Sequence, residues 1–109
     1  ITDDSFISEL KDGKIKNYQV SPKDFGLSFG NFESIKALSP QESFEKVSLA
    51  FSGNKGSVQD MIAINSAAAL KLSGIVKSLK DGVELSKSAM NEGLAQSKLE
   101  SYVKMSNNL

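Results

Sequence analysis

Two acidic residues, Asp3 and Asp4, stand side by side near the beginning of the chain. Adjacent carboxylates can supply oxygen ligands to a hard cation such as Mg²⁺. The alternative is a solvated entrance to the first strand, in which both charges remain in water. We favour the solvated strand entrance and assign neither residue to a metal site.

A Gly-x-x-Gly segment runs from Gly53 to Gly56, just before a predicted helix. Backbone amides at the start of a helix can bind phosphate. The segment lacks the spacing of a P-loop, Gly-x-x-x-x-Gly-Lys-Ser/Thr. A tight turn between two helices is therefore the favoured interpretation.

Asn65 is the odd polar residue in the middle of a mostly apolar predicted helix. Its amide could contact a ligand. It could instead be buried and bonded to the backbone of a neighbouring loop, because a buried polar group needs a partner. We favour the buried structural amide.

Four large apolar residues lie close together in residues 21–32, namely Phe25, Leu27, Phe29 and Phe32. An aromatic platform for nucleic acid needs basic residues between the rings, and only Lys23 is available. These side chains are therefore predicted to anchor the loop to the core. No catalytic, cofactor-binding or metal-binding residue is assigned anywhere in the chain.

The composition excludes several kinds of chemistry. The chain of 109 residues has no His, Cys, Trp or Arg, and its 13 basic residues are all Lys. Zinc sites built from Cys and His, thiol nucleophiles, histidine general bases and bidentate Arg–phosphate contacts are therefore excluded. The formal net charge of zero argues against general nucleic-acid binding.

The same composition suits a protein of the cytoplasm, since no disulfide can form. No apolar run reaches the roughly 20 residues of a membrane span, so no membrane partner is predicted. The length fits one small unit over residues 1–109. The sequence starts at Ile1 rather than Met, which suggests a piece of a longer protein.

Residues 5–20 have the pattern of an antiparallel β-hairpin. Two alternating segments, 5–10 and 15–20, flank an Asp-Gly dipeptide that tolerates positive φ. A hairpin alone is marginal in water, so it must lie on helices or join a larger sheet. A loop is predicted over 21–38.

Residues 57–74 are predicted to form the central helix, with its end at Gly74. The segment is apolar around most of its circumference, as in a helix on which others pack. Ser57 followed by Asp60 resembles a capping box at its start. One helical face is predicted to carry Val58, Met61, Ile62, Asn65, Ala68, Ala69 and Leu72.

Three further helices are predicted, bringing the helical segments to 39–52, 57–73, 78–92 and 94–105. Ser39 with Glu42 and Ser78 with Asp81 indicate helix starts. Gly93 is expected to break the last helical stretch. The predicted class is an α+β piece of an α/β domain, with a hairpin followed by three or four packed helices.

Four segments, in order, resemble the anthranilate phosphoribosyltransferase family. LKDGKIKNYQVSPKDFGL at 10–27 is similar to a hairpin followed by Pro-x-Asp-Phe-Gly-Leu. SPQESFEKVSLAFSGNKGS at 39–57 resembles a helix ending in Leu-x-Gly and a glycine turn. DMIAINSAAALKLSG at 60–74 resembles an Asn-Ala-Ala helix, and SLKDGVELSKSAMNEGLAQSKLE at 78–100 a Ser-Leu-x-x-Gly-Val helix with a Gly-x-Ala break.

The resemblance has departures that affect packing rather than the order of elements. Ser43-Phe44 replaces the usual Asn-Ala, Ser66 replaces Ala and Lys23 replaces Glu. The family's diphosphate loop, Lys-His-Gly segment, anthranilate-contacting Arg and Asp-Glu metal pair would all lie upstream of Ile1. Asp3 and Asp4 do not align with that metal pair.

The resemblance implies a parent enzyme that joins anthranilate to 5-phosphoribosyl diphosphate in tryptophan biosynthesis, using Mg²⁺. This chain would be its C-terminal structural part, inactive alone and without bound Mg²⁺. A small helical interaction module, or part of a related phosphoribosyltransferase-like protein with another substrate, remains open.

Loss of the rest of a sheet would expose the edges of strands 5–10 and 15–20 and apolar side chains beside them. Candidates for exposure are Phe6, Ile7, Ile15 and Tyr18. Such an edge is a template for pairing with another chain. We therefore expect self-association through the hairpin.

Overall fold

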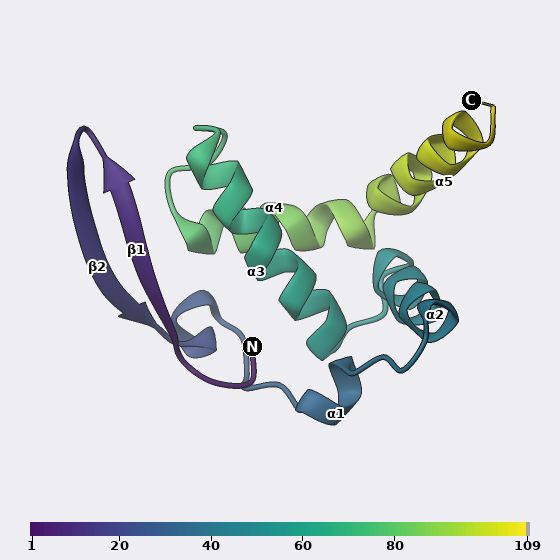
Figure 1. Cartoon of the computed structure of the whole chain (residues 1–109), viewed down its shortest axis with the longest axis horizontal. Helices are drawn as coiled ribbons and strands as arrows, with labels where there is room; N and C mark the ends of the chain where they lie inside the picture. The colour runs from purple at the N-terminus through teal and green to yellow at the C-terminus, as the bar shows by residue number, and fades with distance from the viewer. Residues whose placement is uncertain (109) are drawn as a thin grey trace.

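The computed structural model describes residues 1–108 and consists of a two-stranded hairpin followed by a group of helices (Figure 1). The elements, in chain order, are β1 (Ser5–Lys11), β2 (Lys14–Val20), the 3₁₀ helix η1 (Pro22–Phe25), α1 (Phe32–Ile35), α2 (Pro40–Phe51), α3 (Ser57–Leu72), α4 (Leu79–Asn91) and α5 (Leu94–Asn107). The hairpin followed by helices confirms the predicted fold class. Leu109, the last residue of the predicted single unit, lies outside the described residues.

The hairpin turn follows from its Asp-Gly dipeptide. β1 and β2 pair antiparallel from Ser5 opposite Val20 to Lys11 opposite Lys14. Asp12 and Gly13 between them have φ of 52° and 76°. Positive φ at both central residues marks a turn whose twist matches that of the strands. The hairpin predicted over 5–20 is therefore confirmed.

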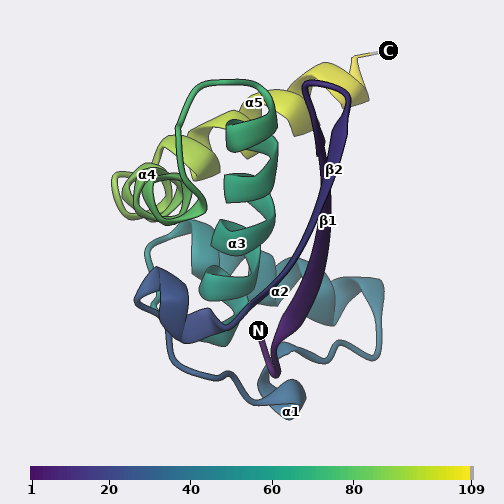
Figure 2. The same cartoon turned by 90° about the vertical axis from the view of Figure 1, so that its left-hand side faces the viewer.

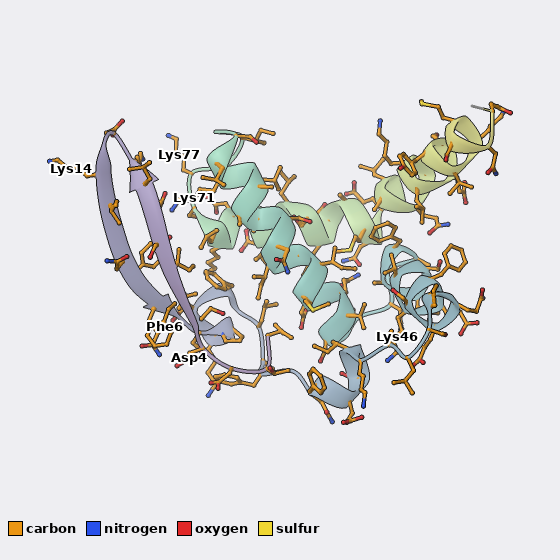
Figure 3. All side chains as sticks on the ribbon, in the orientation of Figure 1. Asp4, Phe6, Lys14, Lys46, Lys71 and Lys77 are labelled. Carbon is orange, nitrogen blue, oxygen red and sulfur yellow. The ribbon has the colours of Figure 1, made fainter. Side chains whose placement is uncertain are left out.

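The two faces of the hairpin have different surroundings. Ile7, Tyr18 and Val20 are half-buried on the face toward the helices. Phe6 and Ile15, on the other face, are 84% and 71% exposed, and Figure 3 shows Phe6 pointing away from the helices. The prediction that Ile7 and Tyr18 are exposed was therefore wrong, because α3 lies opposite their face of the hairpin.

The predicted loop over 21–38 contains two short helical segments. Ser21 and Asp24 form a reciprocal capping box around η1, and the Asn31 side chain caps α1. Leu27 is buried and Phe25 packs against the core. Phe29 and Phe32 are exposed, so only half of the predicted anchors hold the loop.

The helix starts agree with two of the three predicted caps. The Ser39 and Ser78 side chains accept hydrogen bonds from the amides three residues on, at 3.1 Å each. The capping box predicted for Ser57 was wrong, because α3 begins at Ser57 itself, after Gly56. The Asp60 carboxylate instead pairs with Lys87 Nζ at 2.6 Å. Gly74, with φ of 77°, adopts the left-handed conformation predicted beyond the end of α3.

The core lies where α3 crosses α4 (Figure 2). Ala63 and Ala67 of α3 are fully buried, and Val83 and Met90 of α4 are nearly so. The close approach depends on Gly82, where an added Cβ would lie 2.7 Å from Ala67 Cβ and 2.8 Å from Ala67 Cα. Small residues on both helices thus allow their backbones to pack closely.

The buried residues of α3 lie on a different face of the helix from the one predicted. Gln59, Ala63 and Ala67 are its buried residues, whereas Asn65 is exposed. A helix that is apolar nearly all round gives no strong periodic signal, so its orientation is set by the neighbour that fits closest. The prediction that Asn65 is buried was therefore wrong.

Gln59 is the buried polar residue that links three helices. Its Nε2 donates to the Ala50 carbonyl of α2 at 3.2 Å and to Asn91 Oδ1 of α4 at 3.1 Å. Buried polar groups need such partners. This amide therefore fixes the start of α3 between the ends of α2 and α4.

α5 extends away from the other helices, on the side remote from the hairpin (Figure 1). Gly93 separates it from α4 with φ of 82°, as the predicted break requires. No residue of α5 is buried, and Leu94 is exposed rather than continuing the buried α4 face.

Replacing Gly82 with alanine tests the close helix crossing. We expect Gly82→Ala to lower the free energy of unfolding by about 1–3 kcal/mol, because the new methyl group overpacks the contact with Ala67. The cost of overpacking should exceed the gain of about 1 kcal/mol that alanine has over glycine in helix propensity. Urea unfolding followed by circular dichroism measures the change. Glu84→Ala, at an exposed position of the same helix, is the control, and a more stable Gly82→Ala protein would contradict the proposed packing.

Candidate functional site

The acidic pair near the N-terminus makes local hydrogen bonds. The Asp4 amide donates to Asp3 Oδ1 at 2.8 Å, and Asp4 Oδ2 accepts from Gln19 Nε2 at 2.9 Å. Across residues 1–108, no three His, Cys, Asp or Glu side chains gather closely enough to hold a metal ion. The acidic pair thus does not fit the magnesium site expected of the parent enzyme, and we derive no chemistry through a metal here.

The Gly-x-x-Gly segment connects α2 to α3. The Asn54 amide donates to the Leu49 carbonyl at 3.0 Å, and the Gly53 amide donates to the Ala50 carbonyl at 3.1 Å. These two bonds close the end of α2. The segment is therefore the helix–helix turn favoured from its sequence.

Asn65 interacts with its own helix. Its Nδ2 donates to the Met61 carbonyl, one turn earlier, at 2.9 Å. The side chain is exposed and does not reach a neighbouring loop. This local bond explains how an amide is accommodated without burial.

One concave feature is an apolar cleft between the hairpin and the helices, which we call the hairpin cleft. It has a volume of about 330 Å³. The hairpin, α3 and α4 supply most of its walls, with further residues from the N-terminus and η1. Its apolar lining includes Ile1, Ile7, Tyr18, Val20, Phe25, Ile64, Ala67, Ala68, Leu79 and Val83.

A polar network of three residues stands at one end of the cleft. Tyr18 Oη donates to Glu9 Oε1 at 3.0 Å, and Lys71 Nζ lies 3.3 Å from the same oxygen. Figure 3 shows Lys71 on the side of α3 nearest the hairpin. This ion pair joins two elements that are 62 residues apart in sequence.

The network shifts the titration of two of its members. The hydrogen bond from Tyr18, followed by that from Lys71, lowers the pKa of Glu9 below its ordinary value of 4.5. Burial, together with the bond to Glu9, raises the pKa of Tyr18 above 10.0. Both shifts favour the protonation states in which the phenol donates to a carboxylate.

The sequence carries no local signal for this network. The alternation of side chains along a strand places Glu9 and Tyr18 on one face of the hairpin. Lys71, however, comes from a distant helix among scattered lysines, so only the packing of the hairpin beside α3 reveals the pair. The hairpin cleft was missed for the same reason.

Residues 1–96 match the model of the glycosyl transferase family, a/b domain. The chain therefore belongs to this glycosyl transferase family.

Within the family the chain is similar to anthranilate phosphoribosyltransferases. It is 37% identical over 106 residues to the enzyme of Vesicomyosocius okutanii, covering 97% of this chain and 31% of that relative. It is 38% identical over 104 residues to the enzyme of Neisseria meningitidis, covering 94% of this chain and 30% of that relative. The resemblance seen in the sequence motifs is thus confirmed.

A solved structure supports the same relationship. The crystal structure of anthranilate phosphoribosyltransferase from Thermus thermophilus matches with a TM-score of 0.78 and 30% sequence identity. The match covers 89% of this chain and 30% of that one. The chain thus spans about a third of the length of the relatives it matches. None of the helices described in this chain has the length and apolar character needed to cross a membrane.

The pKa of Glu9 provides a test of the polar network. We expect Tyr18→Phe and Lys71→Gln each to raise this pKa toward 4.5, because each removes a hydrogen bond that lowers it. Lys11→Gln, which removes only the smallest of the contributions that lower the pKa, is the control and should raise it least. An NMR titration that follows the chemical shift of the Glu9 side-chain carbonyl carbon measures this pKa in the parent chain and in the three variants.

The same titration predicts the direction of a pH effect on stability. A carboxylate whose pKa is lower in the folded state than in the unfolded state stabilises the folded state at pH values above its unfolded-state pKa. The Glu9 contribution should therefore be present above pH 4.5 and disappear as the pH falls through the lowered pKa. Glu9→Gln should remove it, and an unchanged acid profile in that variant would contradict the network.

Proposed function

We propose that the chain is the C-terminal structural portion of an anthranilate phosphoribosyltransferase. The whole enzyme would transfer phosphoribosyl from 5-phosphoribosyl diphosphate to anthranilate in the tryptophan pathway of the cytoplasm. The observation that carries this proposal is the family match over residues 1–96, together with 37–38% identity to such enzymes along nearly the whole chain.

The role proposed for this portion is to form an outer wall of the enzyme's large domain. The transfer reaction depends on holding a charged diphosphate with backbone amides and Mg²⁺. Across the described residues no three His, Cys, Asp or Glu side chains gather closely enough to hold the cation, and the Gly53 and Asn54 amides already bond to carbonyls of α2. We propose that the substrates, the Mg²⁺ and the catalytic residues lie on the rest of the enzyme.

The alternative of a free-standing helical interaction module is less well supported. Such a module would close its core and leave one polar groove. The described surface instead carries the open apolar hairpin cleft and an exposed outer hairpin face. A related phosphoribosyltransferase with another substrate fits the same fold, and an assay with anthranilate separates it from the proposed enzyme.

The proposed activity is tested with a hybrid enzyme. The segment of the Neisseria meningitidis enzyme that aligns with this chain is replaced by this chain. We expect the hybrid to consume anthranilate in the presence of 5-phosphoribosyl diphosphate and Mg²⁺, and the isolated chain to show no turnover. Loss of anthranilate fluorescence is the measurement.

Two results would contradict the proposal. Turnover by the isolated chain would show that it carries its own active site. A folded but inactive hybrid would show that the chain cannot serve as this portion of the enzyme. The intact Neisseria enzyme is the positive control.

We also propose that the isolated chain self-associates through the outer face of its hairpin. Phe6, Leu10 and Ile15 are largely exposed on this face. The described sheet has only two strands, so each strand has one unpaired edge. Burying apolar surface beside such an edge is favourable by about 25 cal/mol per Å². Lys11, Lys14 and Lys16 oppose pairing only weakly, because their side chains can turn into water.

Light scattering after size exclusion tests this association. We expect a dimer or larger species at about 50 µM, well above a micromolar dissociation constant. The double variant Phe6→Ser/Ile15→Ser should be monomeric, because it removes the apolar contact. Tyr102→Ser/Met105→Ser, which removes similarly exposed residues from α5, is the matched control. A monomeric parent chain would contradict the proposal.

A further inference from the structure

A second hollow, which we call the helix groove, lies among the last four helices. Phe51 of α2, Ile62 and Leu70 of α3, Met90 of α4 and Ala95 of α5 contribute to its walls. It has a volume of about 430 Å³, and small-molecule pockets in proteins span about 300–1,000 Å³. Among residues 1–108, none lines both this groove and the hairpin cleft. The helix groove is therefore a separate hollow that is large enough for a small molecule.

The lining of the helix groove favours an uncharged molecule. Apart from three serines, Ser66, Ser73 and Ser86, every lining residue is apolar, and within residues 1–108 the lining contains no Asp, Glu or Lys. A charged group held inside the groove would lose its hydration without gaining an ion-pair partner. Apolar surface, by contrast, is stabilised when it leaves water for such walls.

Ser86 gives the groove a polar group that needs a partner. This residue is 8% exposed, and its buried Oγ has no hydrogen-bond partner among the residues that the structure describes. The Ser73 hydroxyl, by contrast, donates to the Ala69 carbonyl at 2.8 Å. A serine oxygen can take three staggered positions about the Cα–Cβ bond, and an unpaired buried hydroxyl is costly. A molecule that brings one hydrogen-bonding group into the groove would therefore satisfy Ser86.

Phe51 and Met90 favour an aromatic ring as the apolar part of that molecule. Met90 is buried in α4, and Phe51 is half-buried in α2. A ring can pack against Phe51 in an offset or edge-to-face arrangement. The thioether sulfur of methionine also makes favourable contacts with aromatic rings. Ala89, which projects only a methyl group from the wall, leaves room for a flat ring.

We infer that the helix groove is a binding site for a small, uncharged aromatic molecule that carries one hydroxyl group. The ring packs among the apolar residues, including Phe51 and Met90, and the hydroxyl forms a hydrogen bond with Ser86. The inference depends only on residues of this chain. Its failure would leave the activity proposed for the whole enzyme unaffected, and failure of that activity would leave this site unaffected.

Methionine methyl signals test the site directly, with phenol as the probe. The chain has three methionines, of which Met90 lines the groove and Met61 and Met105 do not. The full chain, labelled with ¹³C at its methionine methyl groups, is titrated with phenol and followed by NMR. We expect the Met90 signal to shift in a saturable way, with a dissociation constant of about 1 mM. The Met61 and Met105 signals should move little.

Benzoate and toluene separate the contributions of charge and hydroxyl. Benzoate has a similar ring but carries a charge, so we expect it to bind at least about tenfold more weakly than phenol. Ser86→Ala should weaken phenol binding about three- to tenfold and change toluene binding by less than about twofold, because only phenol loses a hydrogen bond. Ser88→Ala, which removes an exposed hydroxyl from the same helix, is the matched control and should leave both affinities unchanged.

Several results would overturn the inference. The Met90 signal might stay fixed up to about 10 mM phenol, ten times the expected dissociation constant, or all three methionine signals could shift equally. Equal binding of benzoate and phenol would show that the groove does not select an uncharged molecule, and this comparison uses the parent chain, so it does not depend on the folding of a variant. Equal effects of Ser86→Ala on phenol and toluene would exclude the hydrogen bond. A Met90 shift that grows with protein concentration alone would show a second copy as the occupant.

Discussion

The contact between Ala67 and Gly82 is the constraint on which the rest of the structure depends. A single methyl group added at Gly82 would come within 2.7 Å of Ala67 Cβ, so α3 and α4 cross with almost no side chain between them. This crossing buries Ala63, Ala67 and Val83 together. It determines which side of α3 remains free to face the hairpin, and hence where the cleft lies.

The other elements are attached to this crossing by more selective contacts. Gln59 holds the ends of α2 and α4 against the start of α3 through two hydrogen bonds. Asp60 and Lys87 add an ion pair between α3 and α4. The hairpin, by contrast, is joined to α3 by the single pair Lys71–Glu9 within the described residues. The helices are therefore held together by more contacts than those that hold the hairpin to them.

This uneven packing agrees with the place of the chain among its relatives. A unit that covers about a third of the enzymes it resembles is expected to have surfaces that are complete only in the larger protein. Apolar residues are exposed on the outer hairpin face and along α5, and an apolar cleft opens on the inner hairpin face. These surfaces have the composition of interfaces rather than of ordinary solvent-exposed faces.

The local features were set by the sequence alone, and the long-range ones by tertiary packing. The Asp12-Gly13 turn, the Ser39 and Ser78 caps and the left-handed Gly74 depend on neighbouring residues, so they could be predicted. The family resemblance followed from motifs in the same way. The burial of Gln59, the exposure of Asn65 and the Lys71–Glu9 pair could not be predicted, because the apolar residues of α3 surround the helix and do not select a face. Only the close fit of Ala67 against Gly82 decides that orientation, since it depends on the shape of a second helix.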